Sequence, residues 1–241
     1  NFKDFFKTFA SIISYCTSLK VVHVPNCEIT DGLDVLAKSA AKAKDFQVSY
    51  WDISGNQFED FSPFATIISH SKGPITYLNL NNCNIQSKDS KKLFNALTNF
   101  SYLDHLQYLS IASISLSTEQ SFSAFTNFLK VSELKYLDIS NVVDQASAIL
   151  KFLADEDNTK LSYQKKLETL ILDGIPLGNG HVNNLILLIS KSKTLKALSL
   201  ANTHISKNNL ASIIDAINAN QNITKMSLNL DNLNLNGEDL N

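Results

Sequence analysis

The sequence predicts an α/β fold, a solenoid of about eight strand–helix units of roughly 28 residues that share one parallel sheet. Two observations support this prediction. Short stretches of alternating apolar residues recur at near-constant spacing, and segments with apolar residues at helical spacing follow them. The clearest stretch, 195–205, reads L-x-x-L-x-L-x-x-T-x-I, and its first, fourth and sixth residues point to one side of a strand. One such unit cannot bury its apolar side alone, so neighbouring units must stack on it.

The units follow one another along the chain. Residues 1–18 carry Phe5, Phe6 and Phe9 at spacings of three and four, which predicts the back helix of a truncated repeat. Eight units then start at residues 19, 48, 75, 106, 134, 167, 195 and 223. Their fourth positions are Val22, Trp51, Leu78, Leu109, Leu137, Leu170, Leu198 and Met226. We therefore predict that 1–241 is one domain and, because it stops where a helix should begin, a fragment of a longer solenoid whose last repeat is incomplete.

Capping residues mark the starts of the predicted helices. Ser206 precedes apolar residues at helical spacing, and Thr30, Ser87 and Thr118 stand at corresponding places in earlier units. The polar stretch 155–160 is predicted to be a loop between the fifth helix and the sixth strand. Three further residues, Trp51, Cys27 and Cys83, occupy core or turn positions and are expected to be buried.

Units of this length with a full helix in each resemble the ribonuclease-inhibitor-like class of leucine-rich repeats. Segments 51–56 (WDISGN) and 136–141 (YLDISN) resemble the repeats of CARMIL-type actin regulators. The resemblance implies a right-handed horseshoe with a parallel sheet on its concave face and helices on its convex face. At the ninth position, Cys27, Asn56 and Cys83 match the Asn or Cys of the family, whereas the later units carry other residues. We therefore expect less regular turns in the middle of the solenoid.

The composition excludes several classes of function. A formal charge of −2 offers no electrostatic basis for binding nucleic acid. No run of about 18 apolar residues could span a membrane. All 21 basic residues are lysine, so this segment supplies no arginine finger. Three widely spaced cysteines favour a reducing compartment, and we predict a cytoplasmic protein. The histidines lack zinc-site spacing, so we expect no metal, cofactor or small-molecule substrate.

The candidate binding surface lies on the concave face, toward which the third and fifth positions of each strand point. Tyrosine occupies the third position on four consecutive strands, polar residues occupy the fifth position of the same strands, and Asp173 stands at the seventh position of the sixth unit. The predicted contact residues are Tyr50, Tyr77, Tyr108, Tyr136, Asp52, Asn79, Asp138 and Asp173. Tyrosine is enriched at interface hot spots, but aromatic residues also stabilise sheets by stacking on same-face neighbours. The sequence leaves both interpretations open.

We therefore expect a non-enzymatic scaffold that binds a protein partner, with cytoskeletal and signalling proteins as the candidates. The resemblance also implies an alternative, a GTPase-activating or other regulatory segment similar to the Ran activator. A third interpretation is a spacer or sensor shell within a larger multidomain protein. His23 and Asp52 are expected to pair, but neither has a nucleophile beside it, so we predict no catalytic residue.

Overall fold

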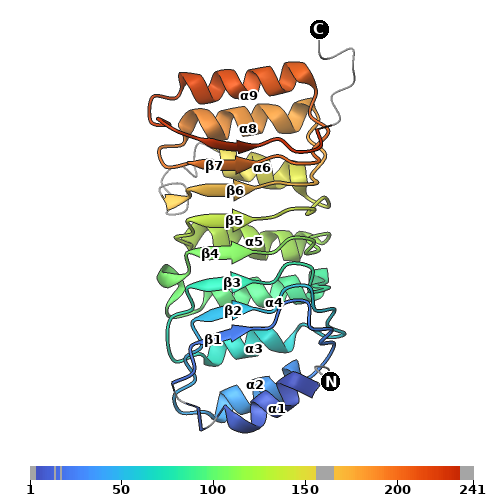
Figure 1. The fold of residues 1–241 in the computed structure, drawn as a ribbon, viewed down its shortest axis with the longest axis vertical. Coiled ribbons are helices and arrows are strands. Elements are labelled where there is room, and N and C mark those ends of the chain that lie inside the picture. The colour runs from blue at the N-terminus through green and yellow to red at the C-terminus, as the bar shows by residue number, and fades with distance from the viewer. Residues whose placement is uncertain (1–3, 14, 17, 156–165, 234–241) are drawn as a thin grey trace.

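Eight strands form one open parallel sheet, and their order in the sheet is their order in the chain (Figure 1). The structure is a computed structural model that describes residues 4–13, 15–16, 18–155 and 166–233. The strands are β1 (Val21–His23), β2 (Tyr50–Asp52), β3 (Tyr77–Asn79), β4 (Tyr108–Ser110), β5 (Tyr136–Asp138), β6 (Thr169–Ile171), β7 (Ala197–Ser199) and β8 (Ser227–Asn229).

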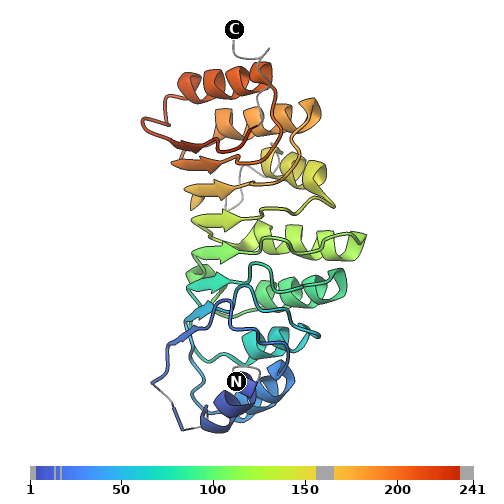
Figure 2. The same cartoon turned by 45° about the vertical axis from the view of Figure 1, so that its right-hand side comes forward.

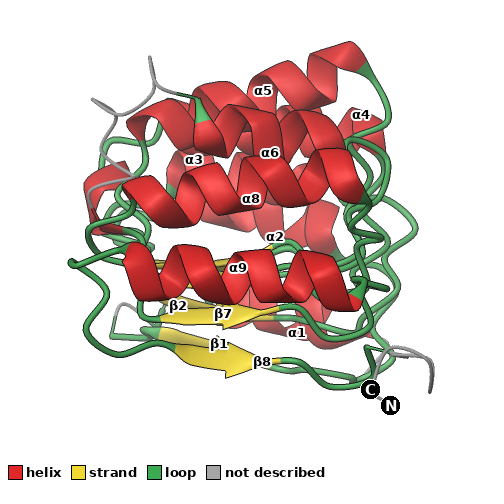
Figure 3. Ribbon diagram, turned by 90° about the horizontal axis from the view of Figure 1, so that it is seen from above, coloured by secondary structure: helices red, strands yellow, loops and turns green. Residues whose placement is uncertain are grey.

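Helices alternate with the strands, and α3 to α9 lie on one side of the sheet (Figure 3). The helices are α1 (Phe5–Ile12), α2 (Leu33–Lys42), α3 (Pro63–His70), α4 (Ser87–Thr98), α5 (Glu119–Val131), α6 (Ala146–Ala154), α8 (Asn179–Lys191) and α9 (Lys207–Ala219), with a short 3-10 helix, η2 (Leu103–His105). We call the opposite side of the sheet, toward which the third and fifth residues of each unit point, the open face. This arrangement confirms the predicted α/β repeat fold with one parallel sheet.

The strand register confirms the predicted start of seven units and corrects the eighth. Tyr50, Tyr77 and Tyr108 are direct partners in neighbouring strands, as expected from their common position. Ala197, however, pairs with Ser227 and not with Lys225, so the eighth unit starts at residue 225. The predicted start, residue 223, was therefore wrong by two residues. Because side chains alternate with period two, a shift of two leaves the same residues facing the core, and hydrophobicity alone does not separate the two frames.

The turn after each strand is regular throughout the sheet, contrary to our expectation for its middle. The eighth residue of every unit is left-handed, with φ between 52° and 71°: Asn26, Gly55, Asn82, Ser113, Asn141, Gly174, Asn202 and Asn232. In the middle units the backbone N–H of Ser113 donates to the carbonyl of Ser140 at 2.8 Å, and the N–H of Asn141 donates to that of Asp173 at 2.8 Å. Equivalent bonds recur along the sheet, so the backbone sets the turn whatever the ninth side chain is.

The side chain of Asn56 adds a further link between two turns. Its amide oxygen accepts hydrogen bonds from the N–H groups of Cys27 and Ile29, each at 3.0 Å, and its amide nitrogen donates to the carbonyl of Val24 at 2.8 Å. The side chain is fully buried. It therefore ties the second turn to the first unit, in addition to the backbone bonds.

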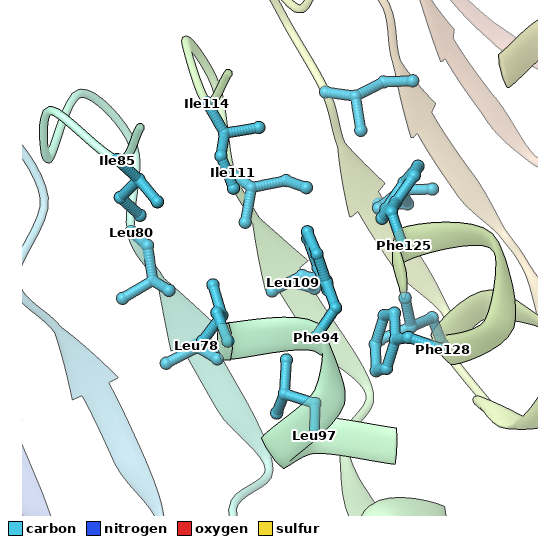
Figure 4. Close-up of a cluster of buried hydrophobic side chains, with 14 of the residues drawn as sticks. Leu78, Leu80, Ile85, Phe94, Leu97, Leu109, Ile111, Ile114, Phe125 and Phe128 are labelled. Atoms are coloured by element: carbon cyan, nitrogen blue, oxygen red, sulfur yellow. The ribbon is translucent and has the colours of Figure 1, made fainter. Parts of the chain in front are cut away.

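The core lies between the sheet and the helices. Figure 4 shows Leu78 and Leu109 from the strands facing Phe94, Phe125 and Phe128 from α4 and α5, and all five side chains are buried. Trp51 and Cys83 are also buried, as predicted. Cys27 is only partly buried, contrary to the prediction. Among the described residues, its unit contains β1, the edge strand of the sheet, which pairs with β2 alone.

Two of the four predicted helix caps are confirmed. The Thr118 hydroxyl accepts from the N–H of Ser121 at 3.2 Å, and the Ser206 hydroxyl accepts from that of Asn209 at 3.3 Å. Ser87 instead begins α4, and Gly32 occupies the cap position that we had assigned to Thr30. The predicted loop 155–160 lies outside the described residues except for Asp155, which follows α6.

The helix layer is least closely packed between α5 and α6, which contact each other much less than other successive helices do (Figure 2). The eleventh residue of the fifth unit, which contains β5 and α6, is Asp144. It is exposed and accepts a hydrogen bond from the Ser115 hydroxyl at 3.0 Å. The following helix, α6, has 9 residues, whereas α5 has 13. A polar eleventh residue removes an apolar contact beneath the helix, while β4 and β5 still pair in the common register.

Candidate functional site

The four tyrosines of the third position form one continuous stack on the open face, which we call the tyrosine ladder. The ring centroids of Tyr50 and Tyr77 lie 4.0 Å apart, those of Tyr77 and Tyr108 3.9 Å, and those of Tyr108 and Tyr136 4.0 Å. The angles between successive ring planes are only 8° to 13°. Parallel strands in direct register place each ring on the next, so the stack follows from sequence position alone.

The stacking determines what the ladder presents to solvent. Tyr77 and Tyr108 have both ring faces covered by neighbouring rings, while all four tyrosines remain partly exposed. Ring edges and hydroxyl groups are therefore the accessible parts at the centre of the ladder. At one end the ring of Tyr50 lies 6.3 Å from that of His23, and at the other end Tyr136 is paired with the shorter Thr169.

Burial further disfavours ionisation of these phenols, which at their ordinary pKa of about 10 are already neutral at pH 7. It raises the pKa of Tyr50, Tyr77 and Tyr108 to about 12, with the adjacent tyrosine hydroxyls as further contributions. Burial is also the main cause of the raised pKa of Tyr136. At neutral pH the ladder is therefore a row of uncharged hydroxyls, each able to donate and accept a hydrogen bond.

The acidic residues of the predicted site lie beside the ladder, but two of them bond mainly within the protein. Asp52 is 6% exposed and accepts from the hydroxyl of Ser54 at 2.7 Å. Its other oxygen lies 3.5 Å from Nδ1 of His23, which confirms the expected pair. Asp138 is 7% exposed and accepts from the hydroxyls of Ser140 and Ser110, each at 2.6 Å.

Asn81 extends this network across two strands and was not among the predicted site residues. Its amide nitrogen donates to Asp138 at 3.1 Å, and its amide oxygen accepts from the N–H of Ala112 at 2.6 Å. The neighbouring Asn79 is partly exposed and donates to the Ser54 hydroxyl at 3.4 Å. Asn81 stands at the seventh position, so its place on this face could have been predicted from the repeat.

Asp173, the last predicted contact residue, lies apart from this network on the sixth unit. One carboxylate oxygen, Oδ1, accepts from the hydroxyl of Ser199 at 2.5 Å and from the N–H of Ala201 at 2.9 Å. The residue remains partly exposed. The structure therefore brings seven of the predicted residues together around β2 to β5 and places Asp173 at the edge of the group.

Two apolar residues of this surface are not among the predicted contact residues. Val21 pairs with Tyr50 and is 54% exposed, which extends the row beyond the ladder. Ile171 is partly exposed at a fifth position that is polar in the neighbouring units. Both could have been found by reading the same columns for exposed apolar residues.

The described residues show no grouping of three histidine, cysteine or acidic side chains that could hold a metal ion. Nor, in that part of the chain, does any helix combine the length and apolar character needed to cross a bilayer. No protein-family model matches the sequence, and a comparison with curated proteins finds no similar one.

Proposed function

We propose that this chain is a non-enzymatic scaffold of the leucine-rich-repeat type, which binds a protein partner in the cytoplasm through the open face of its sheet. The tyrosine ladder is the observation that carries the proposal. It is a stacked, partly exposed and uncharged surface on four adjacent strands. Tyrosine supplies a large contact area together with a hydrogen-bonding group, which is why it is enriched at protein interfaces.

A comparison within the sheet favours binding over a purely structural role for the ladder. Strands β6 and β7 carry Thr169 and Ala197 at the third position, yet they pair in the same parallel register as the tyrosine strands. Strand pairing in this fold therefore does not require tyrosine. The ladder is concentrated on one part of the face, as expected for a surface that recognises a partner.

The proposal can be tested by capturing partners from a cell lysate on the immobilised chain. Tyr77 and Tyr108 are at the centre of the ladder, so the double variant Tyr77→Ala, Tyr108→Ala should weaken capture by about 2 kcal/mol or more. Tyr77→Phe, Tyr108→Phe keeps the stack and isolates the hydroxyls. Lys91→Ala changes an exposed residue of α4 and should leave capture unchanged.

Melting temperature must be measured for the same variants, because removing stacked rings also lowers stability. Loss of specific partners from the alanine variant, with retention by Lys91→Ala, supports the proposal. Partners retained at the wild-type level on an alanine variant of lowered melting temperature would contradict it and assign the ladder a structural role.

A further inference from the structure

The open face is acidic although the whole chain is nearly neutral. The third, fifth and seventh positions of its eight units contain no lysine, whereas the complete sequence has 21 basic residues. The acidic residues at these positions are Asp52, Asp138, Asp173 and Asp231. Asp52 is paired with His23, but the other three have no basic residue at these positions of the face, so the face favours a positively charged partner.

The sixth unit reverses the side-chain pattern of the units before it. Thr169 stands where the four preceding units have tyrosine, and Ile171 stands where its neighbours have Asp138 and Ser199. Two residues further along the same face is Asp173. Ile171, which is partly exposed, lies opposite Asp138 in β5, and the charge of Asp173 is near enough to Tyr136 to contribute to the raised pKa of its phenol.

At the end of the ladder the surface drops from the ring of Tyr136 to the smaller Thr169, and we call this place the step. One face of the Tyr136 ring stacks on Tyr108 at 4.0 Å, while the strand on its other side offers only the short side chain of Thr169. Among the described residues, no further aromatic ring stacks on Tyr136. Asp173 uses Oδ1 for its two internal hydrogen bonds, and no described group bonds to its second oxygen.

We propose that this step holds an arginine side chain from an extended segment of the protein partner. The methylene stem packs on Ile171 and Thr169, the guanidinium lies against the open face of the Tyr136 ring, and its charge is directed toward Asp173. Long cationic side chains combine an apolar stem with a charged head in this way, and a planar guanidinium stacks on aromatic faces better than an ammonium does. This inference rests on the proposed function, because it names the chemistry of the partner that the open face binds.

The test uses a phage-displayed library of random peptides selected on the wild-type chain, followed by affinity measurements with synthetic copies of the enriched peptides. Asp173→Asn is the decisive variant. It removes the charge but keeps an oxygen that can accept from Ser199 and Ala201. Asp34→Asn, on the exposed surface of α2, removes the same charge away from the open face and serves as the matched control.

We expect the enriched peptides to contain arginine. Asp173→Asn and Tyr136→Ala should each weaken binding about five- to tenfold, Asp34→Asn should change it less than about twofold, and added salt should reduce the effect of Asp173→Asn. The Tyr77→Ala, Tyr108→Ala variant separates the two proposals. Peptides that depend on the ladder but lack arginine, or that tolerate Asp173→Asn, would overturn the arginine site and leave the scaffold proposal standing. If no enriched peptide depends on the ladder, both proposals are wrong.

Discussion

The N-terminal and C-terminal halves of the solenoid have the same backbone geometry but differ in the side chains that form their cores. The N-terminal half, through α5, has an aromatic core, and of the 14 phenylalanines only Phe152 lies after residue 128. The buried residues of β6 to β8 and their helices are mainly leucine, isoleucine, valine and alanine. Both halves nevertheless keep the same parallel register and left-handed turns. The repeat therefore fixes strand geometry while leaving core filling and surface chemistry free to vary.

The open face also changes along the sheet, but one strand later than the core does. It carries stacked tyrosines on β2 to β5 and the smaller Thr169, Ala197 and Ser227 on β6 to β8. The last stacked pair, Tyr108 and Tyr136, lies on the two strands whose helices α5 and α6 pack least closely. The tyrosine stack on one side of the sheet thus continues across the junction at which the helices on the other side pack least closely.

The largest expected effect is a loss of folding stability when a core side chain is removed from either half of the solenoid. Trp51→Ala should destabilise the protein by about 3–5 kcal/mol, because it removes a buried ring that contacts Phe46 and Phe64 and leaves a cavity. Leu170→Ala, at the same position of β6, should cost about 2–5 kcal/mol and less than Trp51→Ala. Denaturant unfolding of both variants checks this. A larger loss for Leu170→Ala would reverse the expected order.

The second comparison concerns the turns. Asn56→Ala leaves the part-buried N–H of Cys27 and the buried N–H of Ile29 without their acceptor, and should cost about 2–4 kcal/mol. Thr203→Ala, at the same position of the seventh unit, loses one hydrogen bond to the carbonyl of Leu200 and should cost about 1 kcal/mol. Equal losses in equilibrium unfolding would mean that the Asn56 side chain contributes no extra link.

A third comparison uses glycines of the sixth unit. A Cβ on Gly174 would lie 2.0 Å from Oδ1 of Asn141, and φ there is +70°, so Gly174→Ala should cost about 1–3 kcal/mol. Gly178 has nothing within 4 Å of an added Cβ, so Gly178→Ala is the control. Adding Asn141→Gly to Gly174→Ala removes the clash without adding strain at residue 141, where φ is 58°, and should recover part of the loss. No recovery in thermal unfolding would assign the whole cost to backbone strain.

The smallest expected effect is a loss of stability at alkaline pH that comes from the tyrosines of the ladder. The pKa of Tyr50, Tyr77 and Tyr108 is raised to about 12 in the fold, whereas an unfolded tyrosine ionises near about 10. The stabilisation from the neutral phenols is therefore complete below about pH 10 and is lost as pH rises toward about 12. Near-ultraviolet phenolate absorbance and unfolding should show this loss, and Tyr77→Phe, Tyr108→Phe should reduce it. An unchanged pH dependence in that variant would contradict the assignment.

Sequence pattern predicted those features that depend on residue position within the repeat. The common position of the ladder tyrosines and the burial of Trp51 follow directly from the period. The frame of the eighth unit was wrong because Met226 and Leu228 satisfy the same alternation in both frames. The burial of Asp52 and Asp138 was not predicted, since it depends on hydroxyl groups two residues further along, at Ser54 and Ser140. The extent of the domain, 1–241, and its relation to a longer solenoid remain predictions.

Hydroxyl-radical footprinting of the chain, alone and bound to a captured partner, tests the central claim most directly. Mass spectrometry can follow each tyrosine separately, and Tyr15 and Tyr102 are exposed internal references outside the ladder. We predict that binding lowers the reactivity of Tyr77 and Tyr108 several-fold while Tyr15 and Tyr102 keep theirs. Unchanged reactivity across the ladder, with protection on the helices instead, would contradict binding through the open face.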